Sequence, residues 1–176
     1  NPFFTIIILR NLYKEKMLQF NYEQKRWLWD IDQINHMQIS DNVVDFMTLR
    51  LKELTAKSQD ILQLAASIGN VFNLFILQII HKSSQEYIID ILSDAIAHNI
   101  IIQINKTETN IYYKFVHDKV QQAAYSLANE TEKKEIHLQI GRALLKTYTK
   151  EEIHENVIDI VRQLNEGQNL VSDKYE

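Results

Sequence analysis

Apolar residues recur at helical spacing along most of the chain, and one segment shows the pattern most clearly. Its i, i+3, i+4, i+7 stripe, which marks one buried helix face, consists of Ile61, Leu64, Ala65 and Ile68. Thr55 precedes the stripe as an N-cap residue, and Gly69 follows it where a C-terminal residue adopts the left-handed conformation. These signals together predict a helix between Thr55 and Gly69.

Similar stripes predict helices over most of the remaining sequence. These helices begin near Phe3, after a cap at Asp41, at Leu74, before Ile88, at His117, before Ile136 and near Glu151. The first, from Phe3 to Leu18, is apolar enough to be a buried helix, and the one that contains Ile88 is expected to end at His98 and Asn99.

Two segments alternate between apolar and polar residues, which is the pattern of β-hairpins. In the segment from Gln19 to Asp30 the aromatic residues expected to face each other, with the tryptophans anchored against a core, are Phe20 and Tyr22 with Trp27 and Trp29. The second hairpin consists of the β-branched and aromatic runs Ile100–Ile104 and Ile111–Val116, which the polar stretch "NKTETN" joins.

The order of these elements predicts a fold that is mainly α with two short β-hairpins. Three helices followed by a hairpin, from Thr55 to Val116, are the layout of a winged-helix domain. We therefore expect a helical segment with a hairpin at 1–54, a winged-helix domain at 55–128 and the first helices of a C-terminal array at 129–176.

Composition narrows the class of protein. The chain has 176 residues, with three Gly, one Pro and no Cys. Few glycines and prolines favour helices joined by tight turns, and the absence of cysteine excludes disulfides and thiolate zinc sites and agrees with a reducing cytoplasm. Because the chain starts at Asn1 and not at Met, we interpret it as a segment of a longer cytoplasmic protein.

Charge and hydropathy bear on the partners. The formal net charge of −4 at pH 7 gives no general attraction for nucleic acid or anionic lipid. The longest apolar stretches, "FFTIIIL" and "VFNLFILQII", are shorter than the roughly 20 residues that a membrane-spanning helix needs. We therefore expect no nucleic acid and no membrane among the partners.

Catalytic motifs are missing from the sequence. Its glycines are Gly69, Gly141 and Gly167, so neither a phosphate-binding P-loop nor a dinucleotide-binding G-x-G-x-x-G can form. The six histidines show no H-E-x-x-H spacing, and no G-x-S-x-G segment presents a nucleophile. We expect no catalytic residues, no metal site and no enzyme activity for this chain alone.

The segment "KFVHDKVQQAAYSL" carries the remaining candidate chemistry. A strand-like run ends there in His117 and Asp118, and an amphipathic helix begins. Helix N-termini bind anions, because their backbone N–H groups point outward and partial positive charge gathers at this end. The His-Asp pair is therefore either an ordinary cap or a group that faces a phosphate. Gln121 and Gln122 lie beside the apolar stripe as solvent-facing or interdomain groups.

Four segments together resemble a known family, the C-terminal half of the ATPase module in STAND-class signalling NTPases. They are "NPFFTIIILRNLY", "DNVVDFMTLRLKEL", "ILQLAASIGNVFNL" and "FVHDKVQQAAYSL". The subgroup that they resemble is the hybrid proteins that join a serine/threonine-kinase-like domain, an AAA-type ATPase, a GAF domain and a sensor histidine kinase. The resemblance runs from Asn1 to about Leu170. It implies that a P-loop core precedes this chain and that residues 1–54 form a helical lid before the winged helix.

The resemblance also implies roles for individual residues. Asn1 and Pro2 correspond to the end of the family's G-N-P element, whose proline packs near the adenine; the alternative is a proline that simply starts a helix. "FVHDKV" resembles the family's M-H-D motif, with Val116 in place of Met. By that match His117 contacts the β-phosphate of ADP, and Asp118 caps or braces the helix. The implied cofactor is ATP or ADP, bound mainly by the upstream core, and no metal is bound by this chain.

Three functions follow as alternatives. The leading expectation is a regulatory, non-catalytic part of a signal-transduction ATPase, whose parent protein is linked to a protein kinase or histidine kinase. Its partners are the upstream core and the downstream signalling domains of the same chain. The alternatives are a winged helix that binds DNA and a scaffold for protein interactions. The helix "SQEYIIDILSDAIAH" disfavours DNA, because it carries Glu86, Asp90 and Asp94 and no Lys or Arg.

Overall fold

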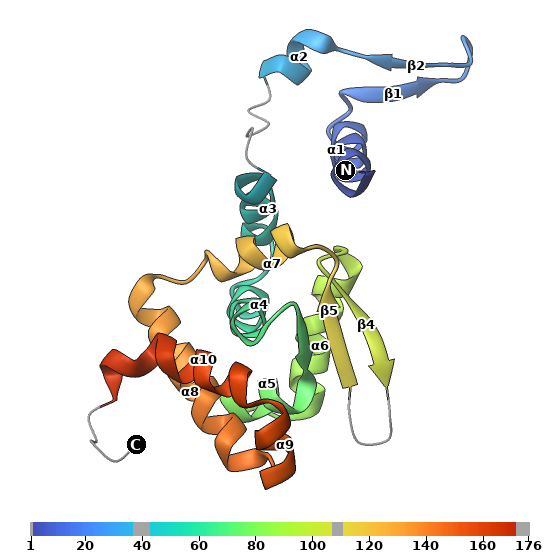
Figure 1. Ribbon diagram of the computed structural model, residues 1–176. Coiled ribbons are helices and arrows are strands. Elements are labelled where there is room, and N and C mark those ends of the chain that lie inside the picture. The colour runs from blue at the N-terminus through green and yellow to red at the C-terminus, as the bar shows by residue number, and fades with distance from the viewer. Residues whose placement is uncertain (1, 37–42, 107–110, 172–176) are drawn as a thin grey trace. The chain divides into compact units, whose positions relative to one another are not determined.

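The computed structural model describes residues 2–36, 43–106 and 111–171, and these residues form a mainly α fold with two small antiparallel sheets (Figure 1). The predicted fold class is thereby confirmed. Contacts within the chain divide it into two units, Asn1–Phe46 and Met47–Glu176. The domain boundaries after residues 54 and 128 remain predictions.

The first unit contains the first predicted helix and hairpin. Its elements are α1 (Pro2–Lys14), β1 (Leu18–Asn21), β2 (Arg26–Trp29) and α2 (Ile31–His36). Helix α1 is shorter than predicted, because Lys16 adopts a left-handed φ of 60° and turns the chain into β1. Phe20 pairs with Trp27 as expected, whereas Trp29 pairs with Leu18.

The described apolar side chains of this unit are mostly exposed. Leu12 is buried, but Tyr13 and Trp29 are 58% and 63% exposed. The prediction of tryptophans anchored against a core is therefore wrong for this unit, whereas the side chains of Phe3, Phe4 and Ile7 in the predicted buried helix lie outside the described set. Two helices and a two-stranded hairpin bury too little surface to enclose the aromatic rings of the hairpin.

The second unit begins within α3 (Val43–Lys52) and is built around α4 (Ala56–Ile68). Met47, Leu51 and Leu54, which recur at helical spacing, are buried. The expected cap Asp41 lies outside the described residues.

Helix α4 begins and ends where the sequence predicts, but the backbone of its C-cap residue Gly69 differs from the prediction. Thr55 is its N-cap, and the Thr55 hydroxyl oxygen accepts a hydrogen bond from the Ser58 N–H at 3.2 Å. At the other end Gly69 has φ +157° and ψ −176°, so the prediction of a left-handed residue is wrong. The reason is that the chain passes directly from α4 into an extended strand.

That strand, β3 (Val71–Asn73), joins the second hairpin in a three-stranded sheet. The chain continues through α5 (Leu74–His81) and α6 (Gln85–Ala97) into β4 (Ile101–Lys106) and β5 (Ile111–Phe115), and the strand order is β3-β5-β4. The sequence did not predict β3. Its Phe72 pairs with Tyr113, and the two rings stack with their centroids 5.7 Å apart.

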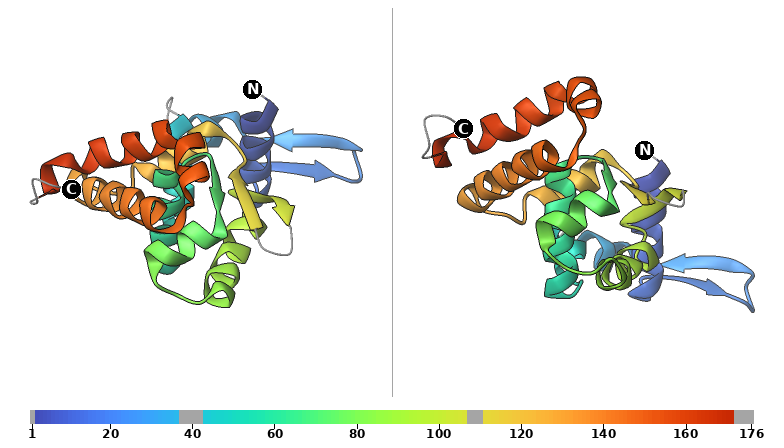
Figure 2. Two further views of the ribbon diagram at one scale, coloured as in Figure 1. Left: turned by 60° about the horizontal axis from the view of Figure 1, so that its bottom comes forward. Right: turned by 90° about the horizontal axis from the view of Figure 1, so that it is seen from below.

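The C-terminal part of the second unit is helical. It comprises α7 (Asp118–Tyr125), α8 (Glu130–Thr147), α9 (Lys150–Glu155), α10 (Val157–Gly167) and a 3-10 turn, Gln168–Leu170. Capping boxes start α8 at Asn129 and α9 at Thr149. Helices α8 and α10 pack along each other (Figure 2), and they share an apolar core with α5 through Ile76, Ile140 and Ile160.

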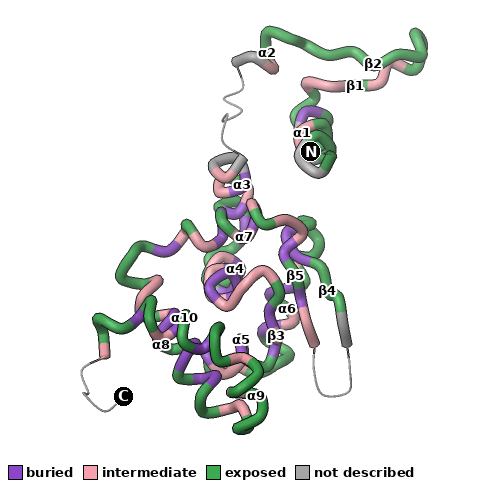
Figure 3. Tube along the Cα trace, in the orientation of Figure 1, coloured by how far each residue is buried: buried purple, intermediate pink, exposed green. Residues whose placement is uncertain are grey.

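Helix α4 lies at the centre of this second unit, where it contacts α5, α6, α7 and α8. Buried residues gather along α4, α5 and β5 (Figure 3). No helix in the described part of the chain is both long and apolar enough to cross a membrane.

Candidate functional site

The predicted His-Asp pair lies where β5 passes into α7. The Val116 N–H donates to the Ile100 carbonyl oxygen at 3.1 Å, which closes the sheet. His117 then has extended backbone angles and is the N-cap of α7, and its carbonyl oxygen accepts from the N–H groups of Val120 and Gln121. The predicted helix start is thus confirmed.

Both side chains of the pair cap the same amide. The Lys119 N–H donates to His117 Nδ1 at 3.1 Å and to Asp118 Oδ1 at 2.8 Å. His117 Nδ1 also lies in close contact with Asp118 Oδ1. The imidazole is 24% exposed and the carboxylate 60% exposed, so the ring is partly enclosed and the acid faces solvent.

The contacts of Nδ1 determine whether Nε2 of His117 carries a proton and can donate a hydrogen bond. If Nδ1 accepts from Lys119, the neutral ring carries its proton on Nε2; if the ring is positively charged and Nδ1–H donates to Asp118, Nε2 is protonated as well. In these two states Nε2–H is a hydrogen-bond donor, whereas in a neutral ring that carries its proton on Nδ1 and donates it to Asp118, Nε2 is an acceptor. The Lys119 amide is already occupied, so an anion at this position would be bound by the imidazole rather than by that backbone N–H.

The other two predicted site residues belong to the first unit. Pro2 is the first residue of α1 and is exposed, which agrees with a proline that starts a helix. Asn1 lies outside the described residues. The contact of these two residues with an adenine remains a prediction.

Helix α7 makes a contact with α4 that the sequence did not predict. Gln121 is partly buried, and its Nε2 donates to the Ala66 carbonyl oxygen of α4 at 3.0 Å. Its interpretation as a solvent-facing group is therefore wrong, and the alternative of an interdomain group depends on domain boundaries that remain predictions. Gln122 is exposed and accepts from the Lys119 ammonium at 3.0 Å.

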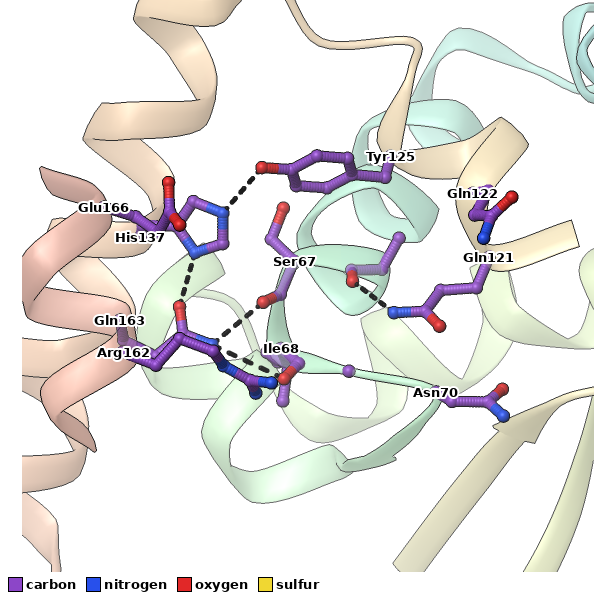
Figure 4. A pocket seen from close by; sticks show the side chains of 12 residues that line it. Ser67, Ile68, Asn70, Gln121, Gln122, Tyr125, His137, Arg162, Gln163 and Glu166 are labelled. Carbon is purple, nitrogen blue, oxygen red and sulfur yellow. Dashed lines mark hydrogen bonds between the residues drawn. The ribbon is translucent and has the colours of Figure 1, made fainter. Parts of the chain in front are cut away.

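A polar pocket of about 530 Å³ opens between the end of α4 and the helices α7, α8 and α10 (Figure 4). Three side chains at its base form a continuous chain of hydrogen bonds. Tyr125 Oη lies 2.9 Å from His137 Nε2, and His137 Nδ1 lies 2.5 Å from Gln163 Oε1. Gln163 Nε2 in turn donates to the carbonyl oxygens of Ser67 at 3.0 Å and Ile68 at 3.5 Å.

The Gln163 amide determines which groups donate and which accept in this series of hydrogen bonds. Only the NH₂ group of Gln163 can face two carbonyl oxygens, so Oε1 must face His137 and accept from Nδ1–H. When this imidazole is neutral, its Nε2 accepts from the Tyr125 hydroxyl. Burial raises the pKa of Tyr125, with further contributions from Lys133, which lowers it, and from Glu166 and Glu130, which raise it.

One carboxylate of the acidic helix α6 is bonded to other side chains of the protein, and two are exposed. Glu86 and Asp90 are exposed, whereas Asp94 Oδ2 accepts from the buried Ser58 hydroxyl at 3.1 Å and Asp94 Oδ1 lies 3.1 Å from His98 Nδ1. In the ranges that the structure describes, no three His, Cys, Asp or Glu side chains are grouped so that they could hold a metal ion.

Comparison with known proteins gives a relative in signal transduction. The chain is 32% identical over 225 residues to hybrid signal transduction histidine kinase G of Dictyostelium discoideum. The similarity covers 100% of this chain and 6% of that protein, so the chain spans a small part of its relative. No protein-family model matches the chain, and no solved structure matches it.

Proposed function

We propose that this chain is the regulatory lid and winged-helix part of a signal-transduction ATPase in the cytoplasm. It closes over ADP or ATP bound by an upstream P-loop core and couples the nucleotide state to downstream signalling domains of the same protein. The chain has no catalytic role of its own, and its parent protein is linked to a protein kinase or histidine kinase. The similarity to a hybrid signal transduction histidine kinase supports this proposal.

The order of elements from α4 to β5 supports the winged-helix assignment. A helix, a strand, two helices and two strands form a compact group in which the first strand pairs with the last. This is the layout of three helices and a β-hairpin with one added strand. The β5–α7 junction, which carries His117, lies directly after this group.

The observation that carries the proposal is the geometry of His117. Its ring lies at the start of α7 beside the Lys119 amide, and Nε2–H is a donor when Nδ1 accepts from that amide or when the ring is positively charged. A β-phosphate oxygen is an acceptor suited to that donor, and the hydrogen bond is charge-assisted. Loss or exchange of the nucleotide would then release the winged helix from the core in a hinge-type movement.

DNA binding is the weaker alternative. Helix α6, which would enter the groove, exposes the carboxylates of Glu86 and Asp90 and has no basic residue. These charges repel phosphates where neutralisation is required.

The ADP dissociation rate of the full-length protein tests the proposal. His117→Ala removes a hydrogen bond to a charged group, worth about 1.5–3 kcal/mol, and should release ADP about ten- to hundredfold faster. His98→Ala, which removes an exposed histidine at the end of α6, is the matched control and should leave the rate unchanged.

A second variant separates nucleotide contact from helix capping. His117→Asn keeps a side-chain acceptor suited to an N-cap and removes the imidazole donor. It should therefore release ADP as fast as His117→Ala while the unfolding midpoint of the 176-residue chain stays close to wild type. An unchanged ADP dissociation rate in both His117 variants would reduce His117 to a capping residue and contradict the proposed function.

A further inference from the structure

The C-terminal end of α4 receives side chains from two distant helices. The last carbonyl groups of a helix have no partner within it. At this end the Gly69 N–H donates to the Ala65 oxygen, Gln121 of α7 donates to the Ala66 oxygen, and Gln163 of α10 donates to the oxygens of Ser67 and Ile68. Two glutamine amides therefore complete the hydrogen bonding of one helix terminus.

One of these glutamines, Gln163, and the serine that it contacts are buried. Gln163 is 3% exposed and Ser67 is 4% exposed. A carbonyl left without a partner at this buried position carries a desolvation cost. The position of α10 is consequently tied to the end of α4 by a bond that is expensive to break.

Helix α7 reaches the same Gln163 by a second route. Tyr125, at the end of α7, contacts His137 of α8, and His137 donates to Gln163 (Figure 4). Helix α7 thus reaches the end of α4 directly through Gln121 and reaches α10 through the Tyr125–His137–Gln163 chain. We name these four side chains, Gln121, Tyr125, His137 and Gln163, the α4-end circuit.

We propose that the α4-end circuit couples the position of α7 to the docking of α10, so that a displacement at the N-terminus of α7 reaches the C-terminal helices. Gln121 lies one helical turn after His117, and its N–H donates to the His117 carbonyl oxygen at 3.2 Å. A movement of the His117 cap therefore changes the angle at which the Gln121 amide meets Ala66. The claim that ADP acts at His117 rests on the proposed function; the coupling between α7 and α10 does not.

Native-state hydrogen exchange of the 176-residue chain tests the coupling. Gln121→Glu keeps the shape of the side chain but replaces its donor with a carboxylate that cannot donate to Ala66. We expect amide exchange in Val157–Gly167 to become about two- to tenfold faster, as the loss of one hydrogen bond predicts, while exchange in Gln85–Ala97 is unchanged.

A neighbouring residue supplies the matched control. Gln122→Glu introduces the same charge one position later, on an exposed side chain that accepts a hydrogen bond from Lys119. This variant should leave amide exchange in α10 unchanged. Equal acceleration in α6 and α10 would show that Gln121 contributes to general stability alone and would overturn the proposal, as would unchanged exchange in α10.

Tyr125→Phe tests the second route, through Tyr125, His137 and Gln163. It keeps the proposal testable if the Gln121 variant does not fold. It removes only the hydroxyl that donates to His137, and it should accelerate exchange in α10 without affecting α6. No selective effect in this variant would contradict the coupling independently. These measurements use no nucleotide, so their failure is distinct from a failure of the ADP dissociation test.

Discussion

Gln163 is a polar residue at a buried position, next to the apolar Ile160 and Leu164 on the inner face of α10. Its amide avoids a burial penalty because both of its ends are bonded, one to His137 and the other to the carbonyl groups of α4. His137 is buried for the same reason, between Gln163 and Tyr125. A satisfied polar chain of this kind fixes the mutual orientation of the helices that contribute to it.

Tyr125 makes the folding stability of the protein sensitive to alkaline pH. Burial raises its folded-state pKa above the ordinary value of 10.0, so the folded protein holds the phenol proton more tightly than the unfolded chain does. The stabilisation is complete below pH 10.0 and is lost as pH rises through the folded pKa.

Tyr125→Phe should therefore cost about 0.5–1.5 kcal/mol at neutral pH through the lost hydrogen bond, and less above pH 10.0. Urea unfolding of wild type and variant at both pH values measures the difference. Tyr113 and Tyr148, whose pKa values burial also raises, are present in both proteins and cancel in the comparison. A difference that grows with pH would contradict this account.

At the scale of elements, periodic stripes and caps predicted most of the second unit. Helices α4 to α8 begin close to their predicted positions because each carries its own cap residue and apolar face. Strand β3 was missed, since its three residues are too few to show alternation and its pairing with β5 depends on residues about forty positions away. Helix α1 was predicted too long, since apolar content alone does not reveal the turn at Lys16.

The candidate site was predicted in part. The helix start at His117 and Asp118 was predicted because its signals are local in sequence, and the role of this pair in binding remains a prediction. The contacts of the α4-end circuit were not predicted, because His137 and Gln163 are 26 residues apart and Gln163 and Ser67 are 96 residues apart. Glutamine beside an apolar stripe gives no local signal that separates a buried bond from a solvated surface.

The packing of α8 against α10 depends on two glycines. A Cβ atom added at Gly167 would lie 2.7 Å from Leu138 Cβ and 3.0 Å from the Lys134 carbonyl oxygen, and backbone atoms cannot easily move aside. A Cβ atom at Gly141 would meet the end of the Leu164 side chain at 2.5 Å, which can shift.

Gly167→Ala should therefore destabilise the chain by about 1–3 kcal/mol through overpacking, although alanine has the higher helix propensity by about 1 kcal/mol. Gly141→Ala should cost less. Urea unfolding at neutral pH measures both variants, and a stabilised Gly167→Ala protein would show that helix propensity exceeds the packing penalty.

In the whole molecule, one helix carries both the proposed ligand contact and the proposed mechanical link. Helix α7 has His117 at its N-terminus and Tyr125 at its C-terminus, with Gln121 between them. The proposed function uses the first end, and the proposed coupling uses the rest. Together they give a route from nucleotide to the C-terminal helices that requires no contact between ADP and α10.

Hydrogen exchange of the full-length protein, with and without ADP, is the measurement that tests this route most directly. ADP should slow exchange in both Asp118–Tyr125 and Val157–Gly167 of the wild-type protein, because the nucleotide holds His117 and the circuit transmits the restraint. In His117→Ala, the protection of both helices by ADP should be greatly reduced at the same degree of saturation. Exchange in α7 and α10 that does not respond to saturating ADP in the wild type, or that responds equally in His117→Ala, would contradict the account.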